Sequence, residues 1–219
     1  MNAFPIILSA PSGAGKTTIA KALLKSRKDL GYSVSCTTRQ SRDGEIPGSD
    51  YYFVGRKEFL TKREHGEFAE SAEVHGNLYG TLRSEVVRVL TSGKHVLMDI
   101  DVQGAAQFTR VFPQSVTIFI LPPSAEVLLS RLKTRQSESA QELVDRLQSS
   151  LQELQSVDEY EYVVVNDNLE QAIQRVNSII DAEVSSRERV AGLRTQVALL
   201  IEQLESEIQS RTHNGRSKK

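Results

Sequence analysis

Short apolar runs recur along the chain, and stretches with helical spacing separate them. The expected strands are residues 6–8, 96–98, 116–121 and 162–165. The expected helices are residues 17–25, 83–91 and 124–133. Because the apolar runs are continuous and rich in β-branched residues, they are typical of parallel strands that are covered on both faces. The pattern therefore predicts an α/β fold with a mostly parallel central sheet.

Two further segments have patterns of their own. The sequence Ser139-Ala140-Gln141-Glu142 predicts a capping box that opens a helix with one apolar stripe. The leucines of that stripe are Leu143, Leu147, Leu151 and Leu154. Residues 36–82, in contrast, are rich in glycine and aromatic residues and lack this regular spacing. We interpret them as an inserted, partly β subdomain.

The C-terminal part of the chain predicts a helix with a narrow apolar stripe. Its members are Val190, Leu193, Val197, Leu200, Leu204 and Ile208. One interpretation is a helix that packs against its own core, and the other is a short coiled-coil contact with a second subunit. Fewer than three heptads support the second interpretation. The polar residues from Arg211 onward predict a disordered tail.

Residues 9–18 form a glycine-rich turn between the first expected strand and the first expected helix. Successive backbone N–H groups in such a turn make an anion site that suits the phosphates of a nucleotide. Lys16 adds a mobile positive charge, and the Thr17 hydroxyl is placed to reach a phosphate-bound Mg²⁺. The pattern G-x-x-x-x-G-K-[ST] is met except at its first glycine, where the chain has Ala10. The plainer alternative is an ordinary turn that ends in a helix cap.

Two aspartates follow the apolar run 96–98. Side chains alternate along a strand, so Asp99 and Asp101 are expected on one face at its carboxyl end. Ligands bind at that end of a doubly wound sheet. One carboxylate there would hold Mg²⁺ directly or through water, and the other would contact an acceptor substrate. The alternative is that both are turn residues.

The insert contains a third group of polar residues. Arg39 and Arg42 lie three residues apart beside a glycine turn, a spacing that lets two guanidinium groups converge on one dianionic phosphate. Tyr51 and Tyr79 supply hydroxyl donors for the same group. Taken alone, such residues are more often a solvated face. Glu70 adds a carboxylate within a partly apolar segment.

Composition narrows the class of protein. The 219 residues are 39% hydrophobic and carry a formal net charge of -1, so no global basic field draws the chain to nucleic acid or to an anionic membrane. The single cysteine, Cys36, excludes an internal disulfide and fits a reducing compartment. Since no apolar stretch has the length of a membrane span, we expect a soluble, cytoplasmic protein.

The ordered set of motifs closely resembles the guanylate kinases over residues 4–185. The matching segments are 9–16 (SAPSGAGK), 37–39 (TTR), 42–45 (RDGE), 76–80 (GNLYG), 99–104 (DIDVQG), 120–124 (ILPPS) and 164–167 (VVND). The resemblance implies a P-loop, three-layer α/β/α nucleoside monophosphate kinase with an inserted α+β GMP-binding subdomain and a helical lid. The implied parts are core at 1–34, 84–125 and 158–210, the GMP-binding subdomain at 35–83, the lid at 126–157 and the tail at 211–219.

The resemblance also implies roles for individual residues, with ATP and GMP as substrates and Mg²⁺ accompanying ATP. The implied GMP-binding residues are Ser35, Arg39, Arg42, Tyr51, Glu70, Tyr79, Thr81 and Asp101. The implied ATP-binding residues are Ala10, Pro11, Ser12, Gly13, Ala14, Gly15, Lys16, Thr17, Thr18 and Asn166. The implied catalytic residues are Lys16, Arg39, Arg42, Arg131, Arg135, Arg146 and Asp99, and the implied magnesium contacts are Thr17 and Asp99.

Within these roles, Glu70 accepts from guanine N1–H and the 2-amino group, with Asp101 near the same amino group. Ser35 and Thr81 lie near O6 and N7. The lid arginines close over the phosphates of ATP, although Gln136 departs from the glycine that the family commonly has there. Because the acceptor phosphate has a second pKa of about 6, no general base is needed.

Two alternatives remain at this stage. One is a kinase for another nucleoside monophosphate, which would share the phosphate loop. The other is a catalytically inactive scaffold that uses the GMP pocket to bind a phosphopeptide. Such modules typically have degraded phosphate loops, whereas this chain retains Lys16 and Thr17. Whether the protein is a monomer or a homodimer through its C-terminal helix is left open.

Overall fold

The computed structural model describes residues 2–74, 76–133 and 140–216. They form two compact units. One unit is Ala3–Ile180, and the other consists of Met1–Asn2 with Asp181–Lys219. Within the described residues, no helix has both the length and the apolar character needed to cross a membrane.

A five-stranded sheet forms the centre of the first unit, with all of its neighbouring strands parallel. In spatial order the strands are β2 (Leu30–Tyr32), β7 (His95–Asp99), β1 (Pro5–Ser9), β8 (Val116–Leu121) and β9 (Tyr162–Val165). The predicted parallel sheet is confirmed. The sequence pattern did not predict β2, because this strand has only three residues, of which Leu30 alone is buried, and so leaves no apolar run.

Helices cover both faces of this sheet. On one face Ile7 and Met98 pack with Val86, Val89 and Phe108 from the helices that follow the insert. Ile6 and Leu8 point to the opposite face and are also fully buried, so that face is covered as well. The helices of this unit around the sheet are α1 (Lys16–Ser26), α3 (Arg83–Thr91), α4 (Val102–Val111) and the larger part of α7 (Leu169–Val184). The three-layer prediction is therefore confirmed.

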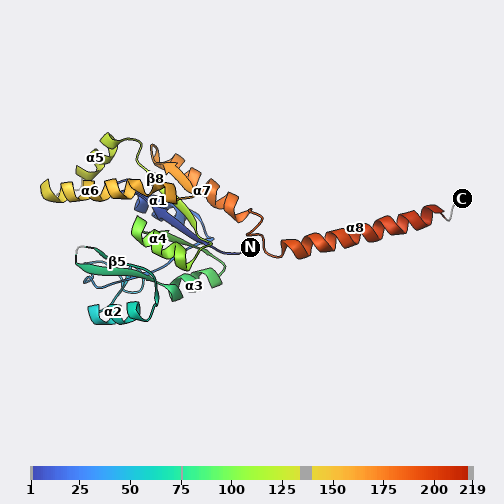
Figure 1. Cartoon of the computed structure of the whole chain (residues 1–219), viewed down its shortest axis with the longest axis horizontal. Coiled ribbons are helices and arrows are strands. Elements are labelled where there is room, and N and C mark those ends of the chain that lie inside the picture. Colours follow the sequence, from blue (N-terminus) through green and yellow to red (C-terminus); the bar gives the residue numbers. More distant parts are fainter. Residues whose placement is uncertain (1, 75, 134–139, 217–219) are drawn as a thin grey trace. The chain divides into compact units, whose positions relative to one another are not determined.

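The insert folds around a sheet of its own. Its strand order is β4 (Tyr51–Phe53), β3 (Ser35–Thr37), β6 (Asn77–Leu82) and β5 (Phe68–Val74), with α2 (Arg56–Glu64) beside β5 (Figure 1). Cys36 is buried in the apolar cluster of this subdomain, and burial raises the pKa of its thiol to about 11. Gly80 is required here, because a Cβ would lie 2.9 Å from the Phe68 ring and 3.0 Å from the Glu70 carbonyl oxygen. The packed insert connects to the central sheet through α4, which contacts β5.

Two helices and a short 3-10 turn fill the segment predicted as the lid. They are α5 (Ala125–Lys133), α6 (Ala140–Gln155) and η1 (Val157–Glu159). Gln136 and Ser139 lie outside the described residues. The predicted leucine stripe of α6 needs a correction, because Leu151 is 62% exposed. Each four-residue step turns a helix about 40° past a full turn, so Leu151 is displaced furthest from Leu143. The three-residue step to Leu154 turns back, and Leu154 is partly buried.

The second unit contains α8 (Leu193–Arg216) and bears on three expectations. The expected core segment 158–210 is divided, because residues from Asp181 belong to this unit. Of the two interpretations of the apolar stripe, packing against its own core is not supported, because Val197, Leu200, Leu204 and Ile208 are exposed. The expected disordered tail is helical as far as Arg216, since polar composition alone does not end a helix.

Candidate active site

The glycine-rich turn between β1 and α1 has the backbone that an anion-binding loop requires. Gly13 and Gly15 have φ angles of 85° and 97°, in the left-handed region that favours glycine. A Cβ at Gly15 would also collide with the side-chain amide of Asn166. Helix α1 begins at Lys16, so its first N–H groups point into the turn without partners inside the helix. The loop geometry therefore requires glycine at both positions.

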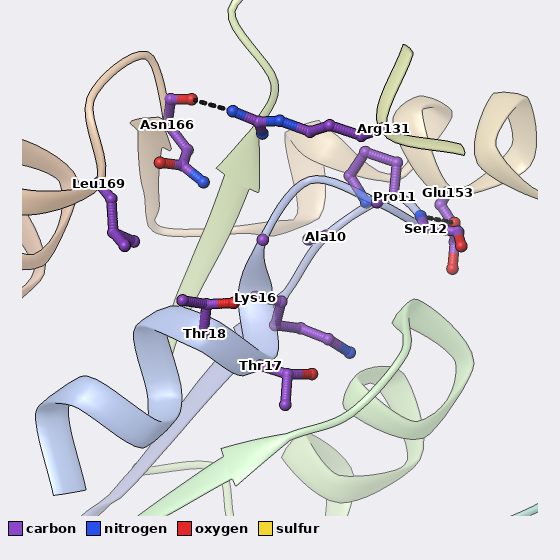
Figure 2. Close-up of a pocket in the computed structure, with 12 residues that line it drawn as sticks. Ala10, Pro11, Ser12, Lys16, Thr17, Thr18, Arg131, Glu153, Asn166 and Leu169 are labelled. Atoms are coloured by element: carbon purple, nitrogen blue, oxygen red, sulfur yellow. Dashed lines mark hydrogen bonds between the residues drawn. The ribbon is translucent and has the colours of Figure 1, made fainter. Parts of the chain in front are cut away.

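A cavity of about 570 Å³ opens at this loop (Figure 2). Its lining includes every predicted ATP-binding residue except Ala14. The Ala14 carbonyl instead accepts a hydrogen bond from Asn166 Nδ2 at 2.7 Å and one from Arg131 Nη1 at 3.3 Å. Asn166 therefore supports the loop from β9, and Arg131 reaches it from α5.

Lys16 extends from the loop toward the carboxyl end of β7. Its Nζ lies 3.0 Å from Asp99 Oδ1 and donates to the Ile100 carbonyl oxygen at 2.8 Å. Thr17 lines the cavity next to it. A hydroxyl oxygen and a carboxylate are donors that Mg²⁺ accepts, and this ion usually takes one or two carboxylates with the rest from phosphate and water. Among the described side chains no group of three His, Cys, Asp or Glu residues is placed to hold a metal. The pair thus fits an ion that arrives with a nucleotide.

Asp101 is placed differently from our expectation. Strand β7 ends at Asp99, and Asp101 is the N-cap of α4, where its Oδ1 accepts from the Gly104 backbone N–H at 2.7 Å. The expectation that both aspartates alternate along one strand was therefore wrong. A capping carboxylate satisfies an otherwise free N–H at a helix start. It also turns Asp101 toward the insert.

Glu70 is a buried carboxylate in a chain of hydroxyl groups. The Thr81 hydroxyl donates to Glu70 Oε1 at 2.6 Å, and Ser35 Oγ lies 3.3 Å from Thr81 Oγ1. Since Thr81 uses its one hydroxyl hydrogen on Glu70, Ser35 is the donor in the second contact. The three residues are neighbours in register across β3, β6 and β5.

The electrostatics of Glu70 are unusual. The pKa of this carboxyl is raised to about 7, chiefly by burial and also by the Asp101 carboxylate, although the Thr81 hydrogen bond and the Lys16 ammonium oppose the rise. A Cβ at Gly104 would lie 3.2 Å from Glu70 Oε2 and 3.3 Å from Asp101 Oδ1. The two carboxylates therefore converge at the start of α4. Perturbed pKa values of this kind are frequent at functional sites.

Arg39 follows β3 in the insert and lies beside the rings of Tyr51 and Phe53. Its Nη2 is 2.7 Å from Glu45 Oε1, and its guanidinium carbon is 5.5 Å from the centre of the Tyr51 ring. Tyr51 and Tyr79 are in edge contact at 6.1 Å, so these three predicted residues are brought together. Arg42 is exposed and joins the group through its backbone N–H, which donates to Glu45 Oε2 at 2.8 Å.

Glu45 belongs to a quoted motif but received no role from the sequence. In the structure one of its oxygens pairs with Arg39 and the other accepts from the backbone of Arg42. These contacts lower the pKa of Glu45. A carboxylate three residues after one arginine and six after the other is the signal that would have indicated this bridge.

Of the three predicted lid arginines, Arg131 and Arg146 belong to the described part of the chain. Arg131 donates to the Ala14 carbonyl, and its Nη2 lies 3.4 Å from the Asn166 carbonyl oxygen (Figure 2). Arg135 lies outside the described residues. Arg146 is half-buried on α6. Among the described residues that line the cavity, α6 contributes Glu153 rather than Arg146.

Glu153 is a further site residue for which the sequence indicated no role. Its Oε2 accepts a hydrogen bond of 3.0 Å from the backbone N–H of Ser12, inside the phosphate loop (Figure 2). Burial raises the pKa of this carboxyl. Glu153 follows Arg146 by two helical turns and so shares its face of α6, but no local spacing links Glu153 to Ser12.

Comparisons with known proteins agree on one family. The family model described as "Guanylate kinase" matches residues 2–183. A guanylate kinase of Nitrosospira multiformis is 48% identical over 177 residues, covering 81% of this chain and 84% of that protein. One from Bartonella henselae is 48% identical over 188 residues, covering 85% and 84%. The crystal structure of guanylate kinase from Anaplasma phagocytophilum has a TM-score of 0.71 at 36% identity and covers 88% of this chain and 92% of that one.

Proposed function

The chain belongs to the guanylate kinase family of ATP:GMP phosphotransferases, and we propose from this premise that it transfers the γ-phosphoryl group of ATP to GMP and dGMP. Mg²⁺ would accompany ATP. The observation that carries the proposal is the buried Glu70 carboxylate, which accepts from Thr81 and converges with Asp101 beside the phosphate loop's Lys16. A base-reading carboxylate and a phosphate-binding loop thus belong to one site.

Glu70 selects guanine by hydrogen-bond complementarity. Guanine presents N1–H and the 2-amino group side by side, and one carboxylate accepts from both. Adenine presents an acceptor nitrogen at the corresponding edge, which would leave the carboxylate unpaired. An unpaired buried polar group costs about 1–3 kcal/mol and more when it is charged, so discrimination of tenfold to several hundredfold follows.

Ser35 and Thr81 complete the base pocket. Their hydroxyl chain points toward Glu70, which fixes the orientation of the carboxylate before a base arrives. Such preorganisation lowers the entropic cost of binding. We assign Ser35 and Thr81 to the guanine O6 and N7 edge, and Asp101 to the 2-amino group.

The phosphate of GMP binds in the Arg39 group. The Arg39 guanidinium is held by Glu45 and by the Gln40 carbonyl oxygen, and the rings of Tyr51 and Phe53 lie beside it. A planar guanidinium fixed in this way presents its remaining donors to a phosphate. Tyr51 and Tyr79 add hydroxyl donors, and Arg42 closes the same site from the exposed loop.

Charge stabilisation drives the transfer itself. The acceptor oxygen is already largely ionised near neutral pH, so the site needs no general base. Lys16 and Arg131 stabilise the charge that develops on the transferred group, while Arg39 directs the acceptor. Arg135 and Arg146 are proposed to join them from the lid. Thr17 and Asp99 would hold Mg²⁺, which supplies further neutralisation of the phosphate charge when bound.

Three further proposals concern the location of the enzyme, its metabolic role and its oligomeric state. We place it in the cytoplasm and in purine nucleotide metabolism, where it would recycle GMP to GDP. The exposed apolar side chains of α8 are the candidate contact for a homodimer, with a monomer as the alternative. Light scattering on the chain truncated near Ser186 decides between them, because an unchanged mass excludes α8 as the dimer contact.

A coupled assay with ATP and a panel of acceptors tests the proposed activity. The acceptors are GMP, dGMP, AMP, CMP, UMP and dTMP. We expect turnover of GMP and dGMP, a large preference over AMP, and loss of GDP formation in Lys16→Met. Equal or greater turnover of AMP would contradict the guanine assignment, and full activity of Lys16→Met would contradict the role of the loop.

A further inference from the structure

Glu153 brings a negative charge into a loop that is built to bind anions. The Ser12 backbone N–H donates to its Oε2 at 3.0 Å, although Ser12 belongs to the turn whose N–H groups face the cavity. A carboxylate and a phosphate oxygen are both anionic acceptors and compete for such a donor. The lid helix α6 therefore supplies an internal acceptor to the phosphate loop.

The charges around Glu153 show which part of the cavity it occupies. The Lys16 ammonium lowers its pKa and the Asp101 carboxylate raises it, so Glu153 lies within electrostatic range of both. In Figure 2 the loop separates Asn166 and Leu169 from Glu153 and the amino end of Lys16. Glu153 is thus on the same side of the loop as the amino end of Lys16, within electrostatic range of Asp101, a residue assigned to the acceptor GMP.

The direction of phosphoryl transfer determines which phosphate of ATP lies on the Glu153 side of the loop. The γ-phosphoryl group is the one that passes to GMP, so it must lie nearest to the acceptor. ADP has no group at this position. A residue that repels an anion only at the position of the γ-phosphate therefore weakens the binding of ATP and leaves the binding of ADP nearly unchanged.

We propose that Glu153 competes with the γ-phosphate of ATP for Ser12 N–H, so that ATP binding displaces it from the loop and ADP binding leaves it in place. The proposal rests on the proposed function, because it assigns the donor nucleotide to this cavity. In this account Glu153 lowers the affinity of the loop for ATP relative to ADP. It is a specificity-determining residue of the donor site.

The same contact re-forms after the transfer. Once the γ-phosphoryl group has moved to GMP, Glu153 returns to Ser12 N–H, and ADP remains without a phosphate in that position. The carboxylate then opposes rebinding of a triphosphate in the position it has retaken. The cost is weaker binding of ATP.

The experiment measures the affinities of two nucleotides in three proteins. Isothermal titration in Mg²⁺ gives the Kd of ADP and of the β,γ-imido analogue of ATP for the wild type, Glu153→Gln and Asp145→Asn. Glutamine keeps the shape and an acceptor for Ser12 but removes the charge. Asp145 is an exposed carboxylate on the same helix and controls for the loss of one negative charge from α6.

In Glu153→Gln we expect the analogue to bind about tenfold more tightly, because a like-charge repulsion at close range is removed. ADP affinity should change less than about twofold, and Asp145→Asn should change neither. The ratio of the two Kd values within one variant is independent of the fraction of folded protein. Weaker binding of the analogue, or an equal change for ADP and the analogue, would overturn the proposal.

The outcome is separable from that of the proposed function. Wild-type protein from the same preparation is assayed for ATP-dependent phosphorylation of GMP. If that activity is absent, the proposed function fails. If it is present and the Kd ratio of Glu153→Gln equals that of the wild type, only the role of Glu153 fails. Glu153→Ala, which also removes the acceptor, should shift the ratio in the same direction.

Discussion

Thr81 and Glu70 are joined by a hydrogen bond of 2.6 Å in which the threonine hydroxyl donates to a buried carboxylate. This bond leaves Oε2 of Glu70 facing the start of α4, where Gly104 and Asp101 lie. A side chain held in this way reads a base without first having to be ordered. The relationship connects the strands of the insert to the helix that follows β7.

The pH dependence of stability follows from the environment of Glu70. Its pKa is raised to about 7 in the folded protein, above the ordinary value of about 4.3 expected in the unfolded chain. The folded state therefore favours the protonated form. This contribution to stability is complete below the unfolded pKa and is lost as the pH rises through about 7.

We expect the free energy of unfolding of the wild type, relative to Glu70→Gln, to fall by up to about 3 kcal/mol between pH 4.5 and pH 8. Urea denaturation of both proteins across this range measures the difference. Other titrating groups are shared by the two proteins and cancel. A difference that stays constant with pH would show that the carboxyl is not perturbed by folding.

Glu45 positions Arg39, so its removal should act on the acceptor side alone. In Glu45→Gln the charge-assisted hydrogen bond to Arg39 is lost, and we expect the KM for GMP to rise about tenfold with the KM for ATP nearly unchanged. Steady-state kinetics with each substrate varied in turn measures this. Asp43→Asn is the matched control in the same exposed loop. An equal rise in both KM values would indicate a general loss of structure instead.

Gly104 tests the convergence of Glu70 and Asp101. A methyl group there would lie 3.2 Å from Glu70 Oε2, which is tighter than ordinary contact. Gly104→Ala should therefore raise the KM for GMP several-fold. Any loss in stability should be partly offset, because alanine is favoured over glycine by about 1 kcal/mol in a helix. Thermal unfolding and kinetics together check the prediction. Gln103→Ala, at the neighbouring exposed position, should leave GMP binding unchanged.

Asn166 supports the phosphate loop through the Ala14 carbonyl at 2.7 Å. Removing this hydrogen bond in Asn166→Ala frees the loop and leaves a buried carbonyl with one donor fewer. We expect the KM for ATP to rise about tenfold and the KM for GMP to change little. An effect confined to GMP would contradict the assignment of Asn166 to the donor side.

The sequence predicted well those helices and strands whose structure is determined by the spacing of neighbouring residues. The strands at 116–121 and 162–165 and the helix at 83–91 begin and end where the apolar spacing places them. The phosphate loop was also predictable, because its function depends on glycine and lysine at fixed offsets. Strand β2 was missed because its three residues take their structure from pairing with β7.

Contacts between residues far apart in the sequence could not be predicted from such local patterns. Ser12 and Glu153 are separated by 141 positions, and nothing in the spacing near either residue specifies their hydrogen bond. Asp101 was misplaced because an N-cap and a strand end look alike in the sequence until the end of β7 is known. The Glu45 bridge needed a folded loop to bring both arginines to one carboxylate.

The most direct test of the account is the rate of phosphoryl transfer from ATP to GMP and to AMP, measured as kcat/KM on the wild type and on Glu70→Gln. We predict that the wild type strongly prefers GMP and that the ratio of kcat/KM for GMP to that for AMP falls by tenfold or more, or roughly 1.4 kcal/mol, in the variant. An unchanged ratio in a folded variant would contradict the central claim that Glu70 reads the guanine base.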